Sequence, residues 1–420
     1  MKLNTKISVF FLYLTLIAHL IYAQDYNTQG SAVKFEFKHT QGDSSRILST
    51  VNEDVFFNMN KDHSSVIINR ITAKVTQVDE DGSGTLECNY MTTEDSKTSD
   101  SKAVFSFGEE YKSIFKRDTL GHYTISDEYF MPTVRDVPIF PPYEVKPGES
   151  WTSDGYEAHD LRRIFNYPKP YTVPFRVTYK YLGTSNINDK TVDVISAKYT
   201  MYMEMDQEDF GNQDKNQYDD YPVTWMGYSD ELIYWDREKG AIQSYSEEFR
   251  IVIETSYGNM LEYKGTASAE ITDFEQLDTE ESLIDVQEKV DSMDISDVTV
   301  KKGEKGLVIS LEDIKFKAES AELLGSEKIK LDKIAEILKS YPNNDLLVTG
   351  HTALAGTAES RQNLSELRAK AVADYLISRG VKDTYHIFTQ GMGARQPLAP
   401  NNSEKNKAKN RRVEITILDE

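Results

Sequence analysis

The stretch Leu346-Leu347-Val348-Thr349-Gly350, which continues as a loop to Gly356, decides the fold of the C-terminal part of this 420-residue chain. A short uncharged run between a Pro-Asn-Asn turn at 342–344 and a glycine is typical of a strand buried on both faces. Apolar residues then recur at helical spacing up to Gly380, which predicts an amphipathic helix that ends there. The recurring residues are Leu364, Leu367, Ala371, Val372, Tyr375 and Leu376.

Elements on either side of this strand and helix complete one domain. Residues 306–311 have the pattern of a strand, and residues 385–390 and 412–418 supply two more. A first helix is indicated by apolar residues at helical spacing, namely Leu331, Ile334, Ala335 and Leu338. The order strand, helix, strand, helix, strand, strand (β-α-β-α-β-β) predicts a layered α/β domain, which we place at residues 301–420.

Several phrases in this region, taken in order, resemble the OmpA-like peptidoglycan-binding domain of OmpA-family envelope proteins. They are Gly350-His351-Thr352, Gly356, Asn363-Leu364-Ser365-Glu366-Leu367-Arg368-Ala369, Gly391-Met392-Gly393 with Pro397, and Asn410-Arg411-Arg412-Val413-Glu414-Ile415. The resemblance implies that the domain holds a diamino-acid residue of the peptidoglycan stem peptide. It also implies that an aspartate directly after the Gly-x-Thr phrase pairs with the ligand's ammonium, while an arginine in the Leu-Ser-x-x-Arg-Ala phrase pairs with its carboxylate.

This sequence departs from the family pattern at two positions. Arg368 stands at the arginine position, but Ala353 replaces the aspartate and Arg361 replaces the family's usual asparagine. Loss of the carboxylate removes a charge-assisted hydrogen bond worth about 1.5–3 kcal/mol. An added guanidinium also repels an ammonium. We therefore expect recognition of the usual ligand to be weakened.

Three interpretations of this pocket remain open. The domain binds peptidoglycan with altered chemistry, in which Arg361 and Arg368 hold a carboxylate and backbone groups near Thr352 do the rest. Alternatively, it has lost this activity and persists as an interaction module, or it binds another anionic envelope ligand. The candidate binding residues are Thr352, Ala353, Gly356, Arg361 and Arg368.

The N-terminal residues predict export. Lys2 and Lys6 flank the start of an apolar run at 7–22, and Ala23 is followed by the polar pair Gln24-Asp25. This pattern is typical of a signal peptide, here residues 1–23, with an uncleaved membrane anchor as the alternative. Gln24 stands where a lipoprotein would carry a cysteine. We expect a protein of the periplasm or outer membrane of a diderm bacterium.

Charge separates the chain into two parts. Residues 298–420 carry 20 basic and 17 acidic side chains, whereas residues 24–297 carry 26 basic and 52 acidic ones. We therefore predict a β-rich domain at 24–160, a second β-rich domain or a continuation of the first at 161–275, and a linker at 276–300. Alternating residues such as Phe175, Val177 and Tyr179 indicate antiparallel strands. The whole chain is expected to be a multidomain α+β protein in which a mainly antiparallel β region precedes the OmpA-like α/β domain.

Two functions of different classes fit these patterns. The first is a non-catalytic envelope protein that associates with the peptidoglycan stem peptide and with outer-membrane or other envelope proteins. The second is a periplasmic carrier, in which the β region forms a binding cup and a degenerate OmpA-like domain only positions it. A membrane barrel is a further alternative for residues 24–275, and the oligomeric state stays open.

Other activities find little support in the sequence. A net charge of −21 argues against nucleic acid as a partner, because a polyanion is repelled. We find no metalloprotease, nucleophile-elbow or phosphate-loop motif, and the single cysteine, Cys88, builds no metal site alone. We therefore assign no catalytic residue, metal ligand or cofactor.

Overall fold

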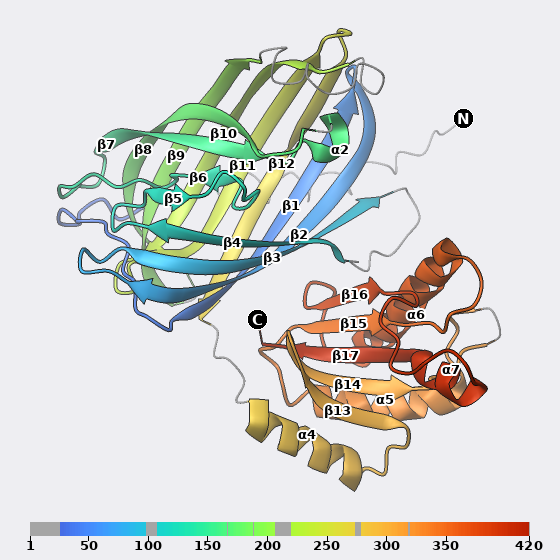
Figure 1. Ribbon diagram of the computed structural model, residues 1–420. Helices are drawn as coiled ribbons and strands as arrows, with labels where there is room; N and C mark the ends of the chain where they lie inside the picture. Colours follow the sequence, from blue (N-terminus) through green and yellow to red (C-terminus); the bar gives the residue numbers. More distant parts are fainter. Residues whose placement is uncertain are drawn as a thin grey trace, which may run out of the picture.

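Two β-sheets of different character organise the molecule (Figure 1). The computed structural model describes residues 26–97, 107–165, 167–187, 189–205, 220–273, 279–317 and 320–419. The predicted signal peptide lies outside these residues. None of the helices within these ranges combines the length and the hydropathy that a membrane-spanning helix needs.

The first sheet contains twelve strands and is antiparallel wherever two strands pair. Their order is β5-β4-β3-β2-β1-β12-β11-β10-β9-β8-β7-β6, so the chain doubles back once, where β1 pairs with β12. The short helix α2 (Arg162–Phe165) joins β7 to β8. The strands are β1 (Ser44–Phe57), β2 (Asn60–Val78), β3 (Gly84–Lys97), β4 (Phe107–Arg117), β5 (Tyr123–Ile125), β6 (Val134–Arg135), β7 (Ser150–His159), β8 (Tyr171–Ile187), β9 (Lys190–Glu204), β10 (Pro222–Asp236), β11 (Ala241–Thr255) and β12 (Met260–Asp273).

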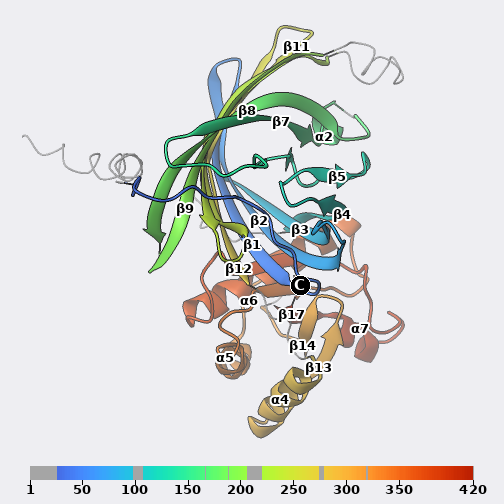
Figure 2. The same ribbon diagram turned by 90° about the vertical axis from the view of Figure 1, so that its left-hand side faces the viewer.

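This sheet curves into a cup whose inner face holds its apolar core (Figure 2). Along β8 the side chains alternate strictly, with Val173 and Phe175 buried inside and Thr172 and Arg176 exposed outside. The segment that precedes β1 contributes Phe35 to the same core, fully buried beside Trp235. We call residues 26–273 the β-cup. Its inward apolar face and polar outer face follow from the period-two pattern of the sequence.

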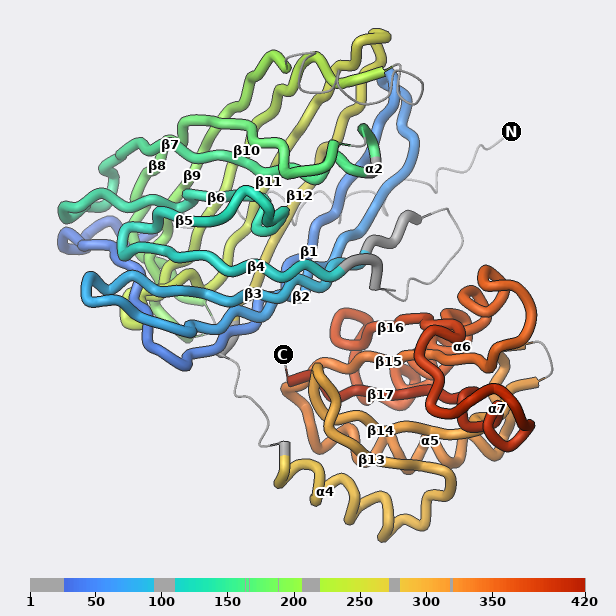
Figure 3. Tube along the Cα trace, viewed as in Figure 1, coloured from blue at the N-terminus to red at the C-terminus, as the bar shows by residue number. Residues whose placement is uncertain are grey.

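One sheet spans both proposed β-rich segments. β7 pairs with β8 across the boundary near residue 160, and each following strand pairs with the next up to β12. Figure 3 shows the strands β7 to β12 on one side of the cup and β1 to β4 on the other. Within the described residues, the strands from Tyr171 to Asp273 therefore belong to the same sheet as those from Ser44 to His159.

The second sheet has five strands in the order β13-β14-β17-β15-β16, with β15 and β16 parallel. The predicted β-α-β-α-β-β core is confirmed, and β13, α4 and α7 are added to it. Helix α4 lies within the expected linker, where Val286 and Val290 pack into the core of this domain. The elements are α4 (Thr279–Ser292), β13 (Val298–Gly303), β14 (Gly306–Glu312), α5 (Gly325–Leu338), β15 (Leu346–Gly350), α6 (Ala358–Ser378), β16 (Ile387–Gly391), α7 (Glu404–Asn410) and β17 (Arg412–Leu418).

The second sheet is covered on both faces. One face, which carries Ile387 and Ile417, packs against the helices of this domain. Its other face carries Leu347, Phe388 and Leu418, which pack against Val66 and Ile68 of β2 on the outside of the β-cup. A buried ion pair crosses the same contact, since Arg70 Nε donates to Asp345 Oδ2 at 2.5 Å. The β-cup and the C-terminal domain are therefore docked through an apolar and charged interface.

Candidate functional site

The loop at 351–357 is fixed by main-chain hydrogen bonds to two neighbouring strands. The Thr352 N–H donates to Gly393 O at 2.8 Å, and the His351 N–H donates to Arg412 O at 2.9 Å. Helix α6 lies close to the sheet here, because a side chain on Gly350 would come within 2.1 Å of the Ser365 carbonyl oxygen. Gly356 has a φ of +75°, a turn conformation that glycine adopts without strain. The Gly-His-Thr phrase thus builds a rigid loop at the end of β15.

Arg361 and Arg368 lie on one face of α6, seven residues and therefore about 10 Å apart along the helix axis. Arg361 Nη1 donates to Gly356 O at 2.5 Å, which holds this guanidinium against the loop. The Arg368 guanidinium instead lies over the Phe316 ring, 4.9 Å from its centroid. The structure therefore brings Thr352, Ala353, Gly356 and Arg361 together, whereas Arg368 borders the site from the Phe316 side.

Several buried polar atoms around this loop lack hydrogen-bond partners. Within the described residues, Thr352 Oγ1, Arg361 Nε and Arg368 Nε make no hydrogen bond. Ala353, at the expected aspartate position, is itself 7% exposed and offers only a methyl group. Unpaired buried donors are costly unless a ligand or water satisfies them. The arrangement offers hydrogen-bond donors and two cations to an incoming anionic group.

The electrostatics of the site favour an anion at Arg368. Burial lowers the pKa of the Arg368 guanidinium, and the positive charge of Arg411 lowers it further. Arg411 is held in place by Glu404 at 2.7 Å and Asp313 at 3.5 Å. A bound carboxylate would relieve the repulsion between the two guanidinium groups.

A buried pair supports the loop from below. His351 Nε2 lies 3.4 Å from the Glu414 carboxylate. Burial lowers the pKa of His351, so its ring is neutral near pH 7. Burial alone would raise the pKa of Glu414. The contact with His351 and the charges of Arg412 and Lys301 outweigh burial and hold this pKa well below its usual range. Neither ring nitrogen of His351 has a hydrogen-bond partner within the described residues, so its contact with Glu414 is electrostatic.

Sequence reasoning missed Phe316, Asp313 and the part played by Arg411. Arg412 braces the final strand through Glu414 at 3.1 Å and Gln396 O at 3.1 Å. Arg411 instead acts electrostatically on Arg368. Asp313 and Phe316 lie just after β14, more than fifty residues from Arg368, and carry no local motif that marks them.

Comparison with known proteins decides the family of this unit, because residues 315–411 match the OmpA family. The C-terminal unit is an OmpA-family domain. It is 36% identical over 137 residues to the probable lipoprotein YiaD of Escherichia coli, which covers 32% of this chain and 62% of that protein. It is also 39% identical over 104 residues to the peptidoglycan-binding protein ArfA of Mycobacterium tuberculosis, covering 25% of this chain and 32% of that protein. This chain thus spans less than two thirds of either relative.

Solved structures that resemble part of this chain include two envelope proteins. An outer membrane protein from Borrelia burgdorferi is 40% identical, with 29% of this chain and 96% of that chain covered and a TM-score of 0.25. The peptidoglycan-associated lipoprotein of Burkholderia pseudomallei is 30% identical, with 26% and 87% covered and a TM-score of 0.23.

A cavity of about 340 Å³ lies apart from the OmpA-family domain, inside the β-cup. Its lining includes Glu231 of β10 and Glu247 of β11, which stand directly opposite each other in the sheet. Burial and mutual repulsion raise the pKa of Glu231 well above its ordinary value. Burial also raises the pKa of Glu247, and the charge of Glu157 adds to this effect.

These raised pKa values predict a pH dependence of stability. Above about pH 4.5 the unfolded chain releases protons that the folded pair retains, so each carboxyl destabilises the fold increasingly as pH rises. We expect Glu231→Gln to gain stability relative to the unmodified protein as pH rises above this value. Urea unfolding of both proteins across pH 4 to 8 measures the difference. A constant difference would show that Glu231 titrates normally.

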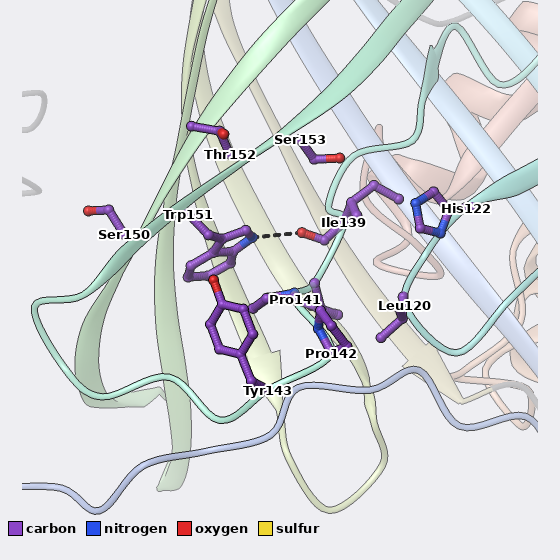
Figure 4. Close-up of a pocket in the computed structure, with 11 residues that line it drawn as sticks. Leu120, His122, Ile139, Pro141, Pro142, Tyr143, Ser150, Trp151, Thr152 and Ser153 are labelled. Atoms are coloured by element: carbon purple, nitrogen blue, oxygen red, sulfur yellow. Dashed lines mark hydrogen bonds between the residues drawn. The ribbon is translucent and has the colours of Figure 1, made fainter.

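A second, more open cavity of about 600 Å³ lies at the rim of the β-cup, beside the proline-rich segment 140–151 (Figure 4). Trp151 Nε1 donates to Ile139 O at 2.8 Å, and the Trp151 ring lies next to Pro141 and Tyr143. His122 on its wall is already paired with Asp118 at 2.9 Å. This segment therefore closes the rim of the apolar core.

Proposed function

We propose that this protein is an exported, non-catalytic cell-envelope protein whose OmpA-family domain associates with peptidoglycan through an altered pocket. In this pocket Arg361 and Arg368 hold a carboxylate of the stem peptide. The Thr352 hydroxyl and neighbouring backbone groups bind the remaining polar atoms, without the aspartate that the family pattern supplies.

The observation that carries this proposal is the set of unsatisfied polar atoms on the 351–357 loop and on helix α6. Thr352 Oγ1, Arg361 Nε and Arg368 Nε are buried without partners in the described part of the chain. The relatives support the ligand class, since ArfA is named a peptidoglycan-binding protein. They also support the location, because another relative, 38% identical over 88 residues, is the outer membrane protein A of Bordetella avium.

Co-sedimentation of the full-length protein with purified peptidoglycan tests the proposal. We expect the unmodified protein to pellet and Arg368→Ala to weaken binding about tenfold or more, because a charge-assisted hydrogen bond is lost. Lys370→Ala is the matched control, since it removes one positive charge from the same helix where Lys370 pairs with Asp374.

Two outcomes separate the parts of the proposal. If the unmodified protein stays in the supernatant, the association with peptidoglycan is wrong. If it pellets and Arg368→Ala binds equally well, the association stands, but Arg368 is not its anion-binding residue. Circular dichroism of each variant confirms that the fold is retained.

A further inference from the structure

The cavity inside the β-cup has the composition of a small-molecule site. Its volume of about 340 Å³ falls within the range of ligand pockets. Apolar side chains from both sides of the cup dominate its wall, among them Ile47, Ile71, Leu86, Phe115, Ile242 and Ile271. The wall belongs to the concave face, opposite the outer face that docks on the OmpA-family domain. An apolar body therefore fits this space without disturbing the docked interface.

Two carboxylates interrupt this apolar wall at one place. Glu231 and Glu247 are directly opposed on neighbouring strands, where side chains on one face have Cβ atoms about 4.5–5.5 Å apart. Ser229 Oγ donates to Glu247 at 2.6 Å. Within the described residues, neither carboxylate forms an ion pair. The charges that act on them belong to each other and to Glu157, and none is positive.

Two buried aspartates elsewhere in the same sheet each pair with a cation. Asp193 is bound by Arg237 Nη2 at 2.5 Å, and Asp236 pairs with Lys190. A buried carboxylate without such a partner is costly, and two that face each other are costlier still. The Glu231/Glu247 pair therefore differs from these ion pairs, because within the described residues no side chain supplies it with a positive charge.

Two tyrosines, Tyr199 and Tyr245, line the same cavity. The Tyr199 hydroxyl donates to Glu157 at 2.8 Å, and the Tyr245 hydroxyl lies 3.3 Å from Ser49 Oγ. Both have a raised pKa, chiefly because they are buried and also because the nearby glutamates repel a phenolate, so each hydroxyl stays protonated. The cavity wall also includes a cation, Arg117 on β4. Its guanidinium carbon lies 4.0 Å from the centroid of the Phe37 ring.

We propose that this cavity binds an amphipathic amine, a molecule with an apolar body and one ammonium group, and that the ammonium lies between Glu231 and Glu247. An ammonium donates three hydrogen bonds and supplies the charge that the opposed carboxylates lack. The apolar body fills the space lined by the isoleucines. Because no residue of the OmpA-family domain takes part, this proposal is independent of peptidoglycan binding.

Three ligands with the same eight-carbon body test the head group. Isothermal titration calorimetry of the full-length protein with octylamine, octanol and octanoate compares an ammonium, a hydroxyl and a carboxylate. We expect octylamine to bind about tenfold to a hundredfold more tightly than octanol. Binding of the amine should also release protons, measured as a dependence of the apparent enthalpy on the buffer, because the free pair retains protons that the ammonium displaces.

Isosteric variants test the position of the ammonium. Glu231→Gln and Glu247→Gln should each reduce octylamine binding toward that of octanol and leave octanol binding unchanged. Neither variant should unfold the protein, because each replaces a carboxyl whose charged form burial disfavours with an uncharged amide of the same shape. Glu248→Gln is the matched control, since Glu248 is the next residue of β11 and is exposed on the outer face.

The remaining outcomes contradict the proposal. Equal affinity for octylamine and octanol would show that the carboxylates do not recognise a cation. Tighter binding of octanoate would assign the head-group site to Arg117. Failure of all three ligands to bind would show that the cavity is not a site for this class of molecule.

Discussion

Asp345→Ala is expected to lower the free energy of unfolding by about 3–5 kcal/mol, the usual cost of breaking a buried ion pair from one side. Asp345 and Arg70 each have a side chain that is 1% exposed, and Arg70 Nε donates to Asp345 Oδ2 at 2.5 Å. Arg46 lies 3.3 Å from the same carboxylate, and His386 Nδ1 lies 2.8 Å from it. Removal of the carboxylate leaves two guanidinium groups close together without the anion that contacts both of them.

The pKa values show how strongly these neighbours hold Asp345 ionised. Burial alone would raise the pKa of this carboxyl, but His386, Arg70 and Arg46 together hold it below its ordinary value. The stabilising contribution is therefore present above the pKa of the unfolded chain and is lost as pH falls through the lower folded value. Chemical denaturation at pH 7 should show the full effect of Asp345→Ala, and denaturation in strong acid should show less.

A control variant away from the interface and a double variant within it separate the effect of charge from the effect of packing. Asp154→Ala removes an exposed ion pair with Arg176 in the same sheet and should change stability by less than about 1 kcal/mol. The double variant Arg70→Met with Asp345→Leu removes both charges and should recover most of the loss, because buried pairs are often replaceable by apolar residues. If Asp345→Ala is as stable as the unmodified protein, the ion pair does not hold the interface.

The same interface limits how independently the two parts act. Val66 and Ile68 of the β-cup pack on Leu347 of β15 and Phe388 of β16. The loop at 351–357 begins directly after β15, which ends at Gly350. The docked cup therefore stiffens the strand that positions Thr352 and Ala353.

Local patterns explain what the sequence could predict. The α6 periodicity and Gly380, whose φ is +67°, depend only on neighbouring residues, so the helix and its end were predictable. The two halves of the cup are joined by the pairing of β1 with β12, where Ile47 meets Ile271. The alternation of residues within each strand does not determine which strand it pairs with. Arg70 and Asp345 are likewise joined only by the docking of two separately patterned units.

The candidate site also combines residues that a local motif places with residues that only the tertiary fold brings near. Ala353 and Arg361 were identified because a contiguous motif fixes their positions, and the structure places both at one loop. Phe316 and Asp313 approach from another part of the chain. Their role in holding Arg368 and Arg411 arises from the way β14 lies beside β17.

Ala353→Asp combined with Arg361→Asn is expected to strengthen peptidoglycan binding by about tenfold to a hundredfold. The aspartate supplies an anion for the ligand's ammonium, and the second change removes a cation that repels it. Because Arg361 Nη1 also binds Gly356 O, Arg361→Asn alone loosens the loop and should gain less than the pair. Co-sedimentation with each single variant and with the double variant measures the coupling between the two positions.

A control variant for this pair of substitutions adds a negative charge at a position other than 353 and 361. Ala358→Asp does this, because Ala358 is exposed in the first turn of α6. If this control binds as tightly as the double variant, the gain reflects net charge and not a restored ammonium site. If only the double variant pellets, the native pocket has lost the activity. If the unmodified protein pellets, Arg368→Ala does not, and the double variant gains nothing, the pocket binds the wall through its two arginines and has no ammonium site to restore.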